Sequence, residues 1–418
     1  MTFGDSPPVP MPNSLSPSIV RTPTLRVAAA LSKQSDTEAA AHELAGEIQA
    51  KLGTVTSDLA FLFFSGYHVE NAGLLAAVTQ RVLQPRVLIG CSGEGVIEGV
   101  QELETATGVT LLAASLPGVT VEPLHMSFSS TQDQFRLHKR PSSHSVNSTF
   151  LLFADPFTMP MQEALKLLDE QYPGIPAIGG LAGGGQERGE NRLILEGDIH
   201  TSGLVGVHLS GPVVIRPVIS QGCRLVGERF VVTKAEHNII HELGGVPAVE
   251  RLRAIFEELP EAERRQAHQS LHLGIAIDEH RDRFGPGDFL VRNLIGADHV
   301  TGSLAVGDIV QEGQTVQFHL RDAQSASEEM NKLLAADQAT HRRRPLGALM
   351  FSCCGRGRGL FGKSHHDAVA LANRIGDIPV AGFFAQGEIG PVGGRNFLHG
   401  YTASMAIFDE PDTDMTNT

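Results

Sequence analysis

The sequence predicts an α/β fold, mixed α+β in detail, with two related halves whose mixed β-sheets are covered by helices. Three observations support this class. Short apolar runs typical of buried strands alternate with segments whose apolar residues share one helix face. Glycine is abundant, at 45 of 418 residues, and gathers in turns that follow strands. The order strand, helix, short strand, Gly-rich turn, strand occurs three times, which indicates internal duplication.

A strand at residues 25–31 and a helix precede the first copy. Ser35 and Glu38 fit a capping box at the start of this helix, and Leu44 with Ile48 marks its buried face. The first copy begins near Leu59. Its elements are expected as strands at 59–64, 87–90, 107–116 and 119–126 and a helix at 71–82.

The second and third copies begin near Phe150 and Leu346. Residues 175–179, IPAIG, align with residues 378–382, IPVAG, and each run enters a Gly-rich turn. The expected elements are strands at 150–154, 175–179, 203–210, 346–351, 378–384 and 401–408, a helix at 161–168, and a helix with Ala368, Leu371 and Ile375 on its apolar face.

A different pattern fills residues 213–343. It predicts strands at 213–218 and 223–232, an antiparallel sheet from strands at 273–277, 289–294, 303–306 and 316–320, and helices at 238–243, 248–258, 261–270 and 323–336. The polar segment 132–148 is expected to be a surface loop, and residues 1–24 and 409–418 are expected to be disordered tails.

Composition excludes several functional classes. A net charge of −14 disfavours binding to nucleic acid or to an anionic membrane surface. No apolar run reaches the roughly 18–20 residues of a membrane-spanning helix, and the N-terminal segment does not resemble a signal peptide. Four cysteines in a chain of this length do not form a disulfide framework, so a reducing cytoplasm is expected.

A formal Walker A match lies at residues 357–364, between a predicted strand and a predicted helix. A nucleotide site also needs a carboxylate for Mg²⁺, commonly at the end of a neighbouring strand. The next strand ends in Ala385 and Gln386 instead. A P-loop-like nucleotide-binding protein therefore remains a minor alternative.

The cysteines and histidines allow a second alternative. Cys353 or Cys354 could act as a nucleophile if His365 or His366 supplied the base. The cysteines lack the C-x-x-C spacing of zinc ligands. The pairs His237/His241 and His268/His272 have helical spacing but no H-E-x-x-H pattern, so neither a metal nor a cofactor is expected.

Polar residues converge at the predicted strand ends. Ser65, Asp155 and Cys353 end the first strands of the three copies, and the Gly-rich turns carry Glu94 and Glu388. Ligands of α/β sheets bind at the carboxyl ends of strands. We therefore expect the Gly-rich turns to face a shared pocket. There Arg356 or Arg358 would hold the carboxylate of a zwitterionic ligand, and one of the two glutamates would hold its ammonium group.

Five runs resemble the FIST (F-box and intracellular signal transduction) family. The most specific are FSCCGRGRGLFG at 351–362, IPVAGFFAQGEIGP at 378–391 and NFLHGY at 396–401, which are similar to the FIST C half. IGCSGEG at 89–95 and GGLAGGG at 179–185 are similar to the FIST N half. The candidate ligand-binding residues are Cys91, Ser92, Glu94, Asp155, Cys353, Cys354, Arg356, Arg358, His366, Glu388 and Asn396.

The resemblance implies a FIST N domain at 25–235 and a FIST C domain at 236–408, in a form that lacks an F-box. It also implies a cytoplasmic sensory protein that binds a small ligand such as an amino acid. Its signal would pass to a partner protein in trans. The expected protein is a sensor rather than an enzyme. The alternatives are a cysteine-dependent enzyme that acts on a carboxylate-bearing small substrate and, as the lesser one, a P-loop-like nucleotide-binding protein.

Overall fold

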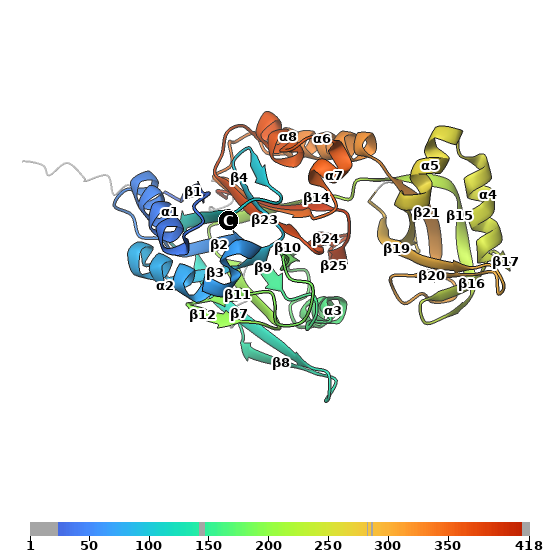
Figure 1. The fold of residues 1–418 in the computed structure, drawn as a ribbon, viewed down its shortest axis with the longest axis horizontal. Coiled ribbons are helices and arrows are strands. Elements are labelled where there is room, and N and C mark those ends of the chain that lie inside the picture. Colours follow the sequence, from blue (N-terminus) through green and yellow to red (C-terminus); the bar gives the residue numbers. More distant parts are fainter. Residues whose placement is uncertain (1–23, 142–146, 282, 286, 412–418) are drawn as a thin grey trace, which may run out of the picture.

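The computed structural model describes residues 24–141, 147–281, 283–285 and 287–411. Most of both predicted tails lies outside these residues. The described residues form four sheets, three of which build the body of the molecule. The fourth sheet belongs to a lobe that stands to one side of the body (Figure 1). The mixed α/β class predicted from the sequence is confirmed.

The first unit of the body begins with a helix that Asp36 caps. The Asp36 carboxylate accepts a hydrogen bond from the Ala39 amide at 2.7 Å, so the cap lies one residue beyond the predicted Ser35. The unit consists of β1 (Arg26–Ser32), α1 (Thr37–Leu52), β2 (Leu59–Ser65), η1 (Gly66–Asn71), α2 (Ala72–Leu83), β3 (Val87–Gly93), β4 (Val96–Glu98), β5 (Gln101–Leu103) and β6 (Val109–Ser115).

The second unit repeats this order with one helix. Its elements are β7 (Thr120–Ser129), β8 (Gln134–Lys139), β9 (Thr149–Ala154), α3 (Met161–Gln171), β10 (Ala177–Leu181), β11 (Leu193–Leu195), β12 (Asp198–His200) and β13 (Leu204–Ser210). The predicted loop at 132–148 contains the largely exposed strand β8, which pairs with β7. Residues 142–146 of that loop lie outside the described residues.

The third unit is split by the lobe, which is inserted between its first strand and its first helix. It consists of β14 (Val214–Ser220), α6 (Ala323–Thr340), β22 (Gly347–Cys353), α7 (Gly357–Phe361), α8 (His366–Ile375), β23 (Val380–Ala385), β24 (Glu388–Val392), β25 (Arg395–His399) and β26 (Ala403–Asp409).

The three units exchange short hairpins in a cycle. The hairpin β4–β5 of the first unit extends the sheet of the third through β23. The hairpin β11–β12 of the second unit extends the sheet of the first through β3, and β24–β25 of the third extends the sheet of the second through β10. Each unit therefore completes another unit's sheet, which ties all three into one body.

One glycine occupies the same place in each unit. Gly90, Gly179 and Gly382 lie opposite a residue of the parallel neighbouring strand on one side and opposite an isoleucine of the exchanged hairpin on the other. A side-chain carbon added at these positions would lie 1.8, 1.9 and 1.8 Å from a backbone oxygen of the parallel strand. Only glycine allows this close approach, so the recurring glycine has a packing cause.

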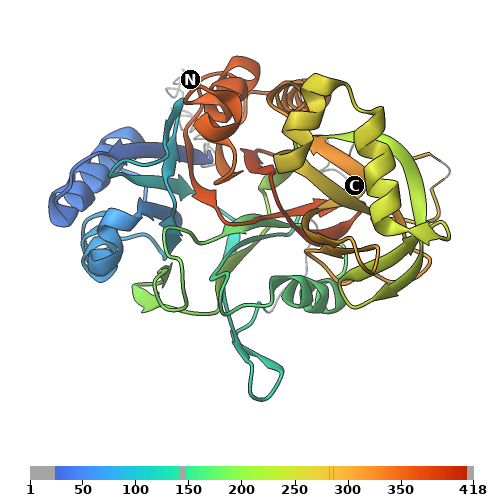
Figure 2. The same ribbon diagram turned by 45° about the vertical axis from the view of Figure 1, so that its right-hand side comes forward.

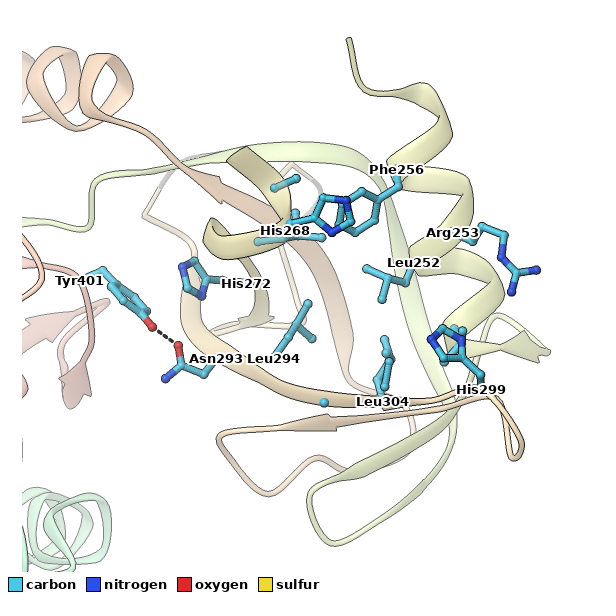
Figure 3. A pocket seen from close by; sticks show the side chains of 15 residues that line it. Leu252, Arg253, Phe256, His268, His272, Asn293, Leu294, His299, Leu304 and Tyr401 are labelled. Atoms are coloured by element: carbon cyan, nitrogen blue, oxygen red, sulfur yellow. Dashed lines mark hydrogen bonds between the residues drawn. The ribbon is translucent and has the colours of Figure 1, made fainter. Parts of the chain in front are cut away.

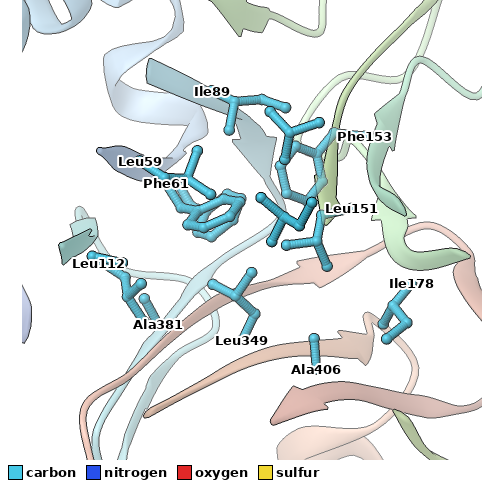
Figure 4. Packing of buried hydrophobic residues seen from close by; sticks show 14 of the residues in the cluster. Leu59, Phe61, Ile89, Leu112, Leu151, Phe153, Ile178, Leu349, Ala381 and Ala406 are labelled. Carbon is cyan, nitrogen blue, oxygen red and sulfur yellow. The ribbon is translucent and has the colours of Figure 1, made fainter. Parts of the chain in front are cut away.

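The inner faces of the three sheets meet in a common aromatic core. Phe63, Phe153 and Phe351 come from equivalent positions of the three units, and their ring centroids lie 5.1, 5.7 and 6.2 Å apart. Aliphatic residues from all three sheets surround them (Figure 4). Helices α1 and α2 cover the outside of the first sheet, α3 covers the second, and α6 with α8 covers the third.

The lobe has its own sheet and its own core. It consists of β15 (Cys223–Glu236), β16 (Ile239–Leu243), β17 (Val246–Pro247), α4 (Ala248–Glu258), α5 (Glu261–Ser270), β18 (Leu271–Ala276), β19 (Phe289–Asp298), β20 (Ser303–Val306) and β21 (Thr315–Arg321). Helices α4 and α5 lie over the antiparallel sheet (Figure 2). The expected division at residues 235–236 falls on the last two residues of β15, which pair with β16 inside the sheet of the lobe.

One predicted helix of the lobe is wrong. The helix expected at 238–243 is instead strand β16 (Ile239–Leu243), preceded by a turn at residue 238. Ile239 and Ile240 pair with β15 on one side and with β20 on the other. These cross-strand hydrogen bonds outweigh a local spacing that also fits a helix face. His237 and His241 consequently do not share a helix, and neither do His268 and His272, because His272 lies in β18.

Candidate functional site

The Gly-rich turns of the three units meet at one end of the body, as predicted. The Gly183 amide donates to the Ser92 carbonyl at 3.0 Å, and the Glu94 amide donates to the Phe384 carbonyl at 3.1 Å. The Leu181 amide donates to the Gly387 carbonyl at 2.8 Å, which closes the ring of contacts. The turns are therefore packed directly against one another by backbone hydrogen bonds.

Several predicted site residues hold these turns in place. The fully buried Asp155 accepts hydrogen bonds from the Asn191 amide at 3.0 Å and from the Thr158 hydroxyl at 2.6 Å. The Ser92 hydroxyl accepts from the Arg192 amide at 3.2 Å. Cys91 is buried in the core, and burial raises the pKa of its thiol well above the ordinary value.

Arg356 is 1% exposed and is paired within the protein. Its Nε and Nη2 atoms donate to the two carboxylate oxygens of Asp367 at 2.6 and 2.9 Å, and Nη1 donates to the Tyr401 carbonyl at 3.3 Å. Burial alone would raise the pKa of Asp367, but the Arg356 guanidinium holds it well below its usual range. The fork that we expected to bind a ligand carboxylate binds Asp367 in this structure.

Two further candidates have saturated hydrogen bonds. His366 lies 2.9 Å from an Asp367 oxygen through Nδ1 and 2.6 Å from the Ser327 hydroxyl through Nε2. The Asn396 amide group bonds Ala177, Asp169 and the carbonyl of residue 175, and so attaches strand β25 to the second unit. Both side chains connect elements of the body.

Glu94 and Arg358 are exposed at the edge of the turns. Glu94 and Glu104 line a hollow of about 500 Å³ together with Ser65 and Gly184. The Glu104 carboxylate accepts the Arg358 backbone amide at 3.0 Å, so it lies beside the start of α7. Of the two glutamates predicted to hold a ligand, Glu94 lines this hollow, and Glu104 adds an acidic group that was not predicted.

The thiols of Cys353 and Cys354 lie beside each other where β22 ends. Cys353 is 8% exposed and Cys354 is exposed. The Glu388 carboxyl is buried next to them, and its Oε2 atom accepts the Thr402 amide at 3.0 Å. Burial raises the pKa of Glu388 well above its ordinary value, and the neighbouring Cys353 thiol adds to that rise.

The geometry does not support the two alternative chemistries. Residues 357–361 form helix α7 inside the Walker A match, and the Glu104 carboxylate occupies a backbone amide that a phosphate would need. His365 accepts the Glu102 amide at 2.9 Å, so neither it nor His366 is free as a base for a cysteine. Among the described residues, no cluster of His, Cys, Asp or Glu could hold a metal ion.

A second cavity lies in the lobe, at a place that no sequence motif indicates. It has a volume of about 480 Å³ and lies between helices α4 and α5 and strands β19 and β20 (Figure 3). Leu252, Phe256, Leu294 and Leu304 supply much of its apolar lining. Tyr401, which comes from the body between β25 and β26, lines it as well.

His272 gives this cavity an unusual polar group. The residue is 5% exposed, and neither ring nitrogen has a hydrogen-bond partner among the described residues. Burial lowers the pKa of His272 to about 4, helped by Arg321 and His319, so its imidazole is neutral at physiological pH. A buried ring with two unused nitrogens is a ready partner for a polar ligand atom.

The lining that the structure describes contains basic side chains and no acidic one. Arg253, His268 and His299 line the cavity with His272, and no acidic side chain of the described residues does. This is notable in a chain of net charge −14. Sequence reasoning missed the site because its residues come from five separate segments. The helical spacing of His268 and His272 was the only available signal.

Comparison with known proteins identifies the family. The FIST N domain matches residues 58–246, and the FIST C domain matches residues 248–391. An uncharacterized protein of Mycobacterium tuberculosis, Rv0628c, is 40% identical over 384 residues, which cover 92% of this chain and 100% of the relative. The uncharacterized protein Mb0898c of Mycobacterium bovis is 38% identical over 384 residues, which cover 92% of this chain and 99% of the relative.

The chain belongs to the FIST family. FIST domains are sensory domains that bind ligands in signal transduction. The FIST N match begins just before β2, so it covers the first unit without β1 and α1, the second unit, β14 and the first strands of the lobe. The FIST C match begins at α4. The lobe cavity lies within the FIST C part, apart from Tyr401, which follows the matched residues. No helix of the described residues is long and apolar enough to cross a membrane.

Proposed function

We propose that this FIST protein is a sensor that binds a small organic ligand in the lobe cavity. The observation that carries the proposal is the buried, unpartnered imidazole of His272 beside a largely apolar cavity to whose lining the body contributes Tyr401. A volume of about 480 Å³ lies within the range of small-molecule sites, which are commonly apolar with a few placed polar groups.

The charge of the lining favours a carboxylic acid with an apolar body. Leu252, Phe256 and Leu304 offer contacts to an aromatic or aliphatic group. Arg253 supplies positive charge for the carboxylate, His299 supplies a hydrogen-bond donor, and His272 can donate or accept one hydrogen bond. An ammonium group would meet no carboxylate among the described lining residues, which disfavours an amino acid in this cavity.

The position of Tyr401 supports a sensory role. Its ring lies in the cavity wall, and its carbonyl accepts a hydrogen bond from the buried Arg356 of the body. The Arg321 guanidinium lies 4.7 Å from the centroid of the same ring and donates to the Gly355 carbonyl. A ligand that moves Tyr401 would therefore act on contacts that join the lobe to the body.

An amino acid ligand fits the hollow at the Gly-rich turns better. Glu94 and Glu104 line that hollow and suit an ammonium group, and Arg358 is exposed nearby for a carboxylate. Our proposed site for such a second ligand consists of Glu94, Arg358 and the backbone of the turns, with Ser92, Cys354 and Glu388 behind them. This candidate rests on acidic groups that the lobe cavity lacks.

We further propose that the protein works in the cytoplasm and signals to a partner protein in trans. The thiols of Cys91, Cys223, Cys353 and Cys354 are all free, which is typical of a reducing compartment. Among the described residues, the lobe exposes large apolar side chains at Val231, Ile295, Val300 and Ile309. Exposed apolar side chains on the ligand-binding lobe would suit contact with a partner.

A thermal-shift screen of the full chain against aromatic and aliphatic carboxylates and against amino acids tests the proposal. A bound carboxylate should raise the Tm by roughly a few degrees, because a ligand that binds the native state stabilises it. Ala297→Phe, which fills the cavity, should abolish that shift. Val300→Phe adds the same ring at a 95% exposed position nearby and should preserve it.

Two outcomes would count against this site. If Ala297→Phe folds and still responds like the wild type, the ligand does not lie in the lobe cavity. If amino acids alone shift the Tm and Glu94→Gln removes the effect, the hollow at the Gly-rich turns is the ligand site instead.

A further inference from the structure

The vicinal thiols of Cys353 and Cys354 are held at a junction of three backbone segments. The Cys353 amide donates to the Thr402 carbonyl at 2.9 Å, and the Cys354 amide donates to the Ala385 carbonyl at 3.0 Å. The Arg356 amide donates a hydrogen bond to the Cys353 carbonyl at 2.8 Å. These bonds fix the backbone on both sides of the pair, so the two sulfur atoms stay beside each other.

The two thiols differ in access and in proton affinity. Cys354 is exposed, whereas Cys353 is 8% exposed. The Cys353 thiol hydrogen-bonds the Cys354 sulfur, which lowers the pKa of Cys354 and raises that of Cys353. One sulfur is therefore an accessible nucleophile, and its neighbour keeps a proton.

Glu388 provides a separate observation, a buried polar atom beside the thiols that lacks a hydrogen-bond partner in the described part of the chain. Its carboxyl is fully buried beside Cys353, and its Oε1 atom has no hydrogen-bond partner among the described residues. A buried carboxyl oxygen without a partner is costly. Because this oxygen lies beside the two thiols, its hydrogen bonding should change when the thiols change their chemical state.

We propose that Cys353 and Cys354 form a peroxide-sensitive site that closes reversibly to a vicinal disulfide. The Cys354 thiolate attacks a hydroperoxide, so that an S–O bond forms, the O–O bond breaks, and the released alkoxide or hydroxide takes a proton from solvent. Cys353 then gives up its proton and attacks the sulfenic sulfur. The S–S bond forms, the S–O bond breaks, and water leaves. Sulfur is oxidised by two electrons and the peroxide is reduced.

The geometry of adjacent residues makes this disulfide easy to reduce. Consecutive Cα atoms across a trans peptide are about 3.8 Å apart, which is shorter than the roughly 4.4–6.8 Å of ordinary disulfides. Strain of this kind favours the dithiol, so the reduced form is the resting state and cellular thiols restore it. This property suits a reversible signal rather than a structural bond.

The site lies close to the contacts between body and lobe. The carbonyl of Gly355, just after the pair, accepts the Arg321 guanidinium, and that guanidinium stacks on Tyr401. Thr402, which accepts the Cys353 amide, directly follows Tyr401. Closing the disulfide would move the segment to which both contacts are attached.

The test uses the full chain exposed to hydrogen peroxide, followed by alkylation and peptide mass spectrometry. We expect the peptide with Cys353 and Cys354 to lose two hydrogens, to escape alkylation and to recover with dithiothreitol. The buried Cys91 and Cys223 serve as internal controls that should be alkylated only after unfolding. Oxidation of Cys91 or Cys223 at the same rate as this peptide would overturn the proposal.

Three substitutions separate the roles of the thiols. In Cys353→Ser, Cys354 should stay as a sulfenic acid that dimedone traps. In Cys354→Ser, oxidation of the peptide should slow about tenfold or more, because the remaining thiol is shielded and protonated. Cys223→Ser is the matched control and should oxidise like the wild type. Wild-type protein that accumulates a lasting dimedone adduct, or a Cys354→Ser variant that oxidises at the wild-type rate, contradicts the assignment.

Discussion

Tyr401 of the body stacks on His272 of the lobe, with ring centroids 4.2 Å apart and an angle of 34° between the rings. Tyr401 holds this position with a backbone φ of 62°, a left-handed conformation that is uncommon for a side chain of its size. Its hydroxyl donates to the Asn293 side chain, also in the cavity lining. Strained backbone of this kind is concentrated at ligand clamps and switch regions, which supports a ligand-responsive role for this contact.

Replacing Tyr401 tests this contact directly. Tyr401→Ala should weaken carboxylate binding at the lobe by on the order of 1–3 kcal/mol, because it removes the ring from the cavity wall and from Arg321. Tyr401→Phe keeps the ring and should cost less than about 1.5 kcal/mol, the worth of one hydrogen bond. Calorimetric titration measures both. Equal losses in the two variants would mean that the ring itself contributes nothing.

His272 predicts a pH dependence of stability. Its pKa is about 4 in the folded chain against 6.5 for the ordinary side chain, so the unfolded state binds the proton first as the pH falls. Stability is therefore lost from about pH 6.5 down to about pH 4, by roughly 3 kcal/mol for this group. His272→Phe should lose less stability than the wild type over that window.

Urea unfolding at several pH values measures the difference between His272→Phe and the wild type. His319 and His399 are also buried with a pKa of about 4, so both proteins should lose some stability. The comparison isolates His272 because the other groups are common to both. Parallel curves for the two proteins would show that His272 takes up its proton without penalty in the folded state.

We expect Arg356 to stabilise the fold rather than to bind a ligand. Arg356→Lys keeps the charge but loses the paired hydrogen bonds to Asp367, so we expect a loss of about 1–3 kcal/mol in the free energy of unfolding. The exposed Arg358 provides the matched control, since Arg358→Lys should change stability by under about 0.5 kcal/mol. Denaturant unfolding decides the matter. A stable Arg356→Lys protein with weakened ligand binding would restore the original pocket assignment for Arg356.

The recurring glycine of the parallel strands gives a sharp packing test. Gly382→Ala would place a carbon 1.8 Å from the Met350 carbonyl oxygen and should cost about 3 kcal/mol or more, or prevent folding. Gly359→Ala in helix α7 meets no atom within 4 Å and should leave stability within about 1 kcal/mol of the wild type. Circular dichroism melts of the two variants provide the comparison. Similar melting temperatures would mean that the strands separate easily to admit the methyl group.

Sequence patterns were sufficient for the three units because each relies on local signals. Apolar runs such as residues 59–64 are buried on both faces, and the Gly-rich turns follow strands whose glycines have a packing cause. The short exchanged hairpins were not predicted. Strands of three residues such as Val96–Glu98 carry too little periodicity to detect, and their partners lie in another unit.

The candidate site likewise has a part that could be predicted from the sequence and a part that could not. The convergence of the Gly-rich turns followed from the order of strands, because parallel strands end at one edge of a sheet. The roles of Arg356 and Asn396 could not be predicted in the same way. A residue type gives the charge and the hydrogen-bonding capacity of a side chain, but it does not give the residue to which that side chain bonds. Arg356 bonds to Asp367 and Asn396 bonds to Asp169 only because helices α8 and α3 bring these residues into contact.

Local chemistry along the chain thus sufficed for the fold class, the threefold recurrence, the turns at one end and the likeness to the FIST family. Folding alone decided that three units would exchange hairpins, that β14 and α6 would join the third unit from either side of the lobe, and that Tyr401 would lie against His272, a residue 129 positions earlier in the chain. The physical reason is distance along the sequence. Propensity and periodicity act over a few residues, whereas the lobe cavity is built by burial and pairing between segments that meet only in the folded state.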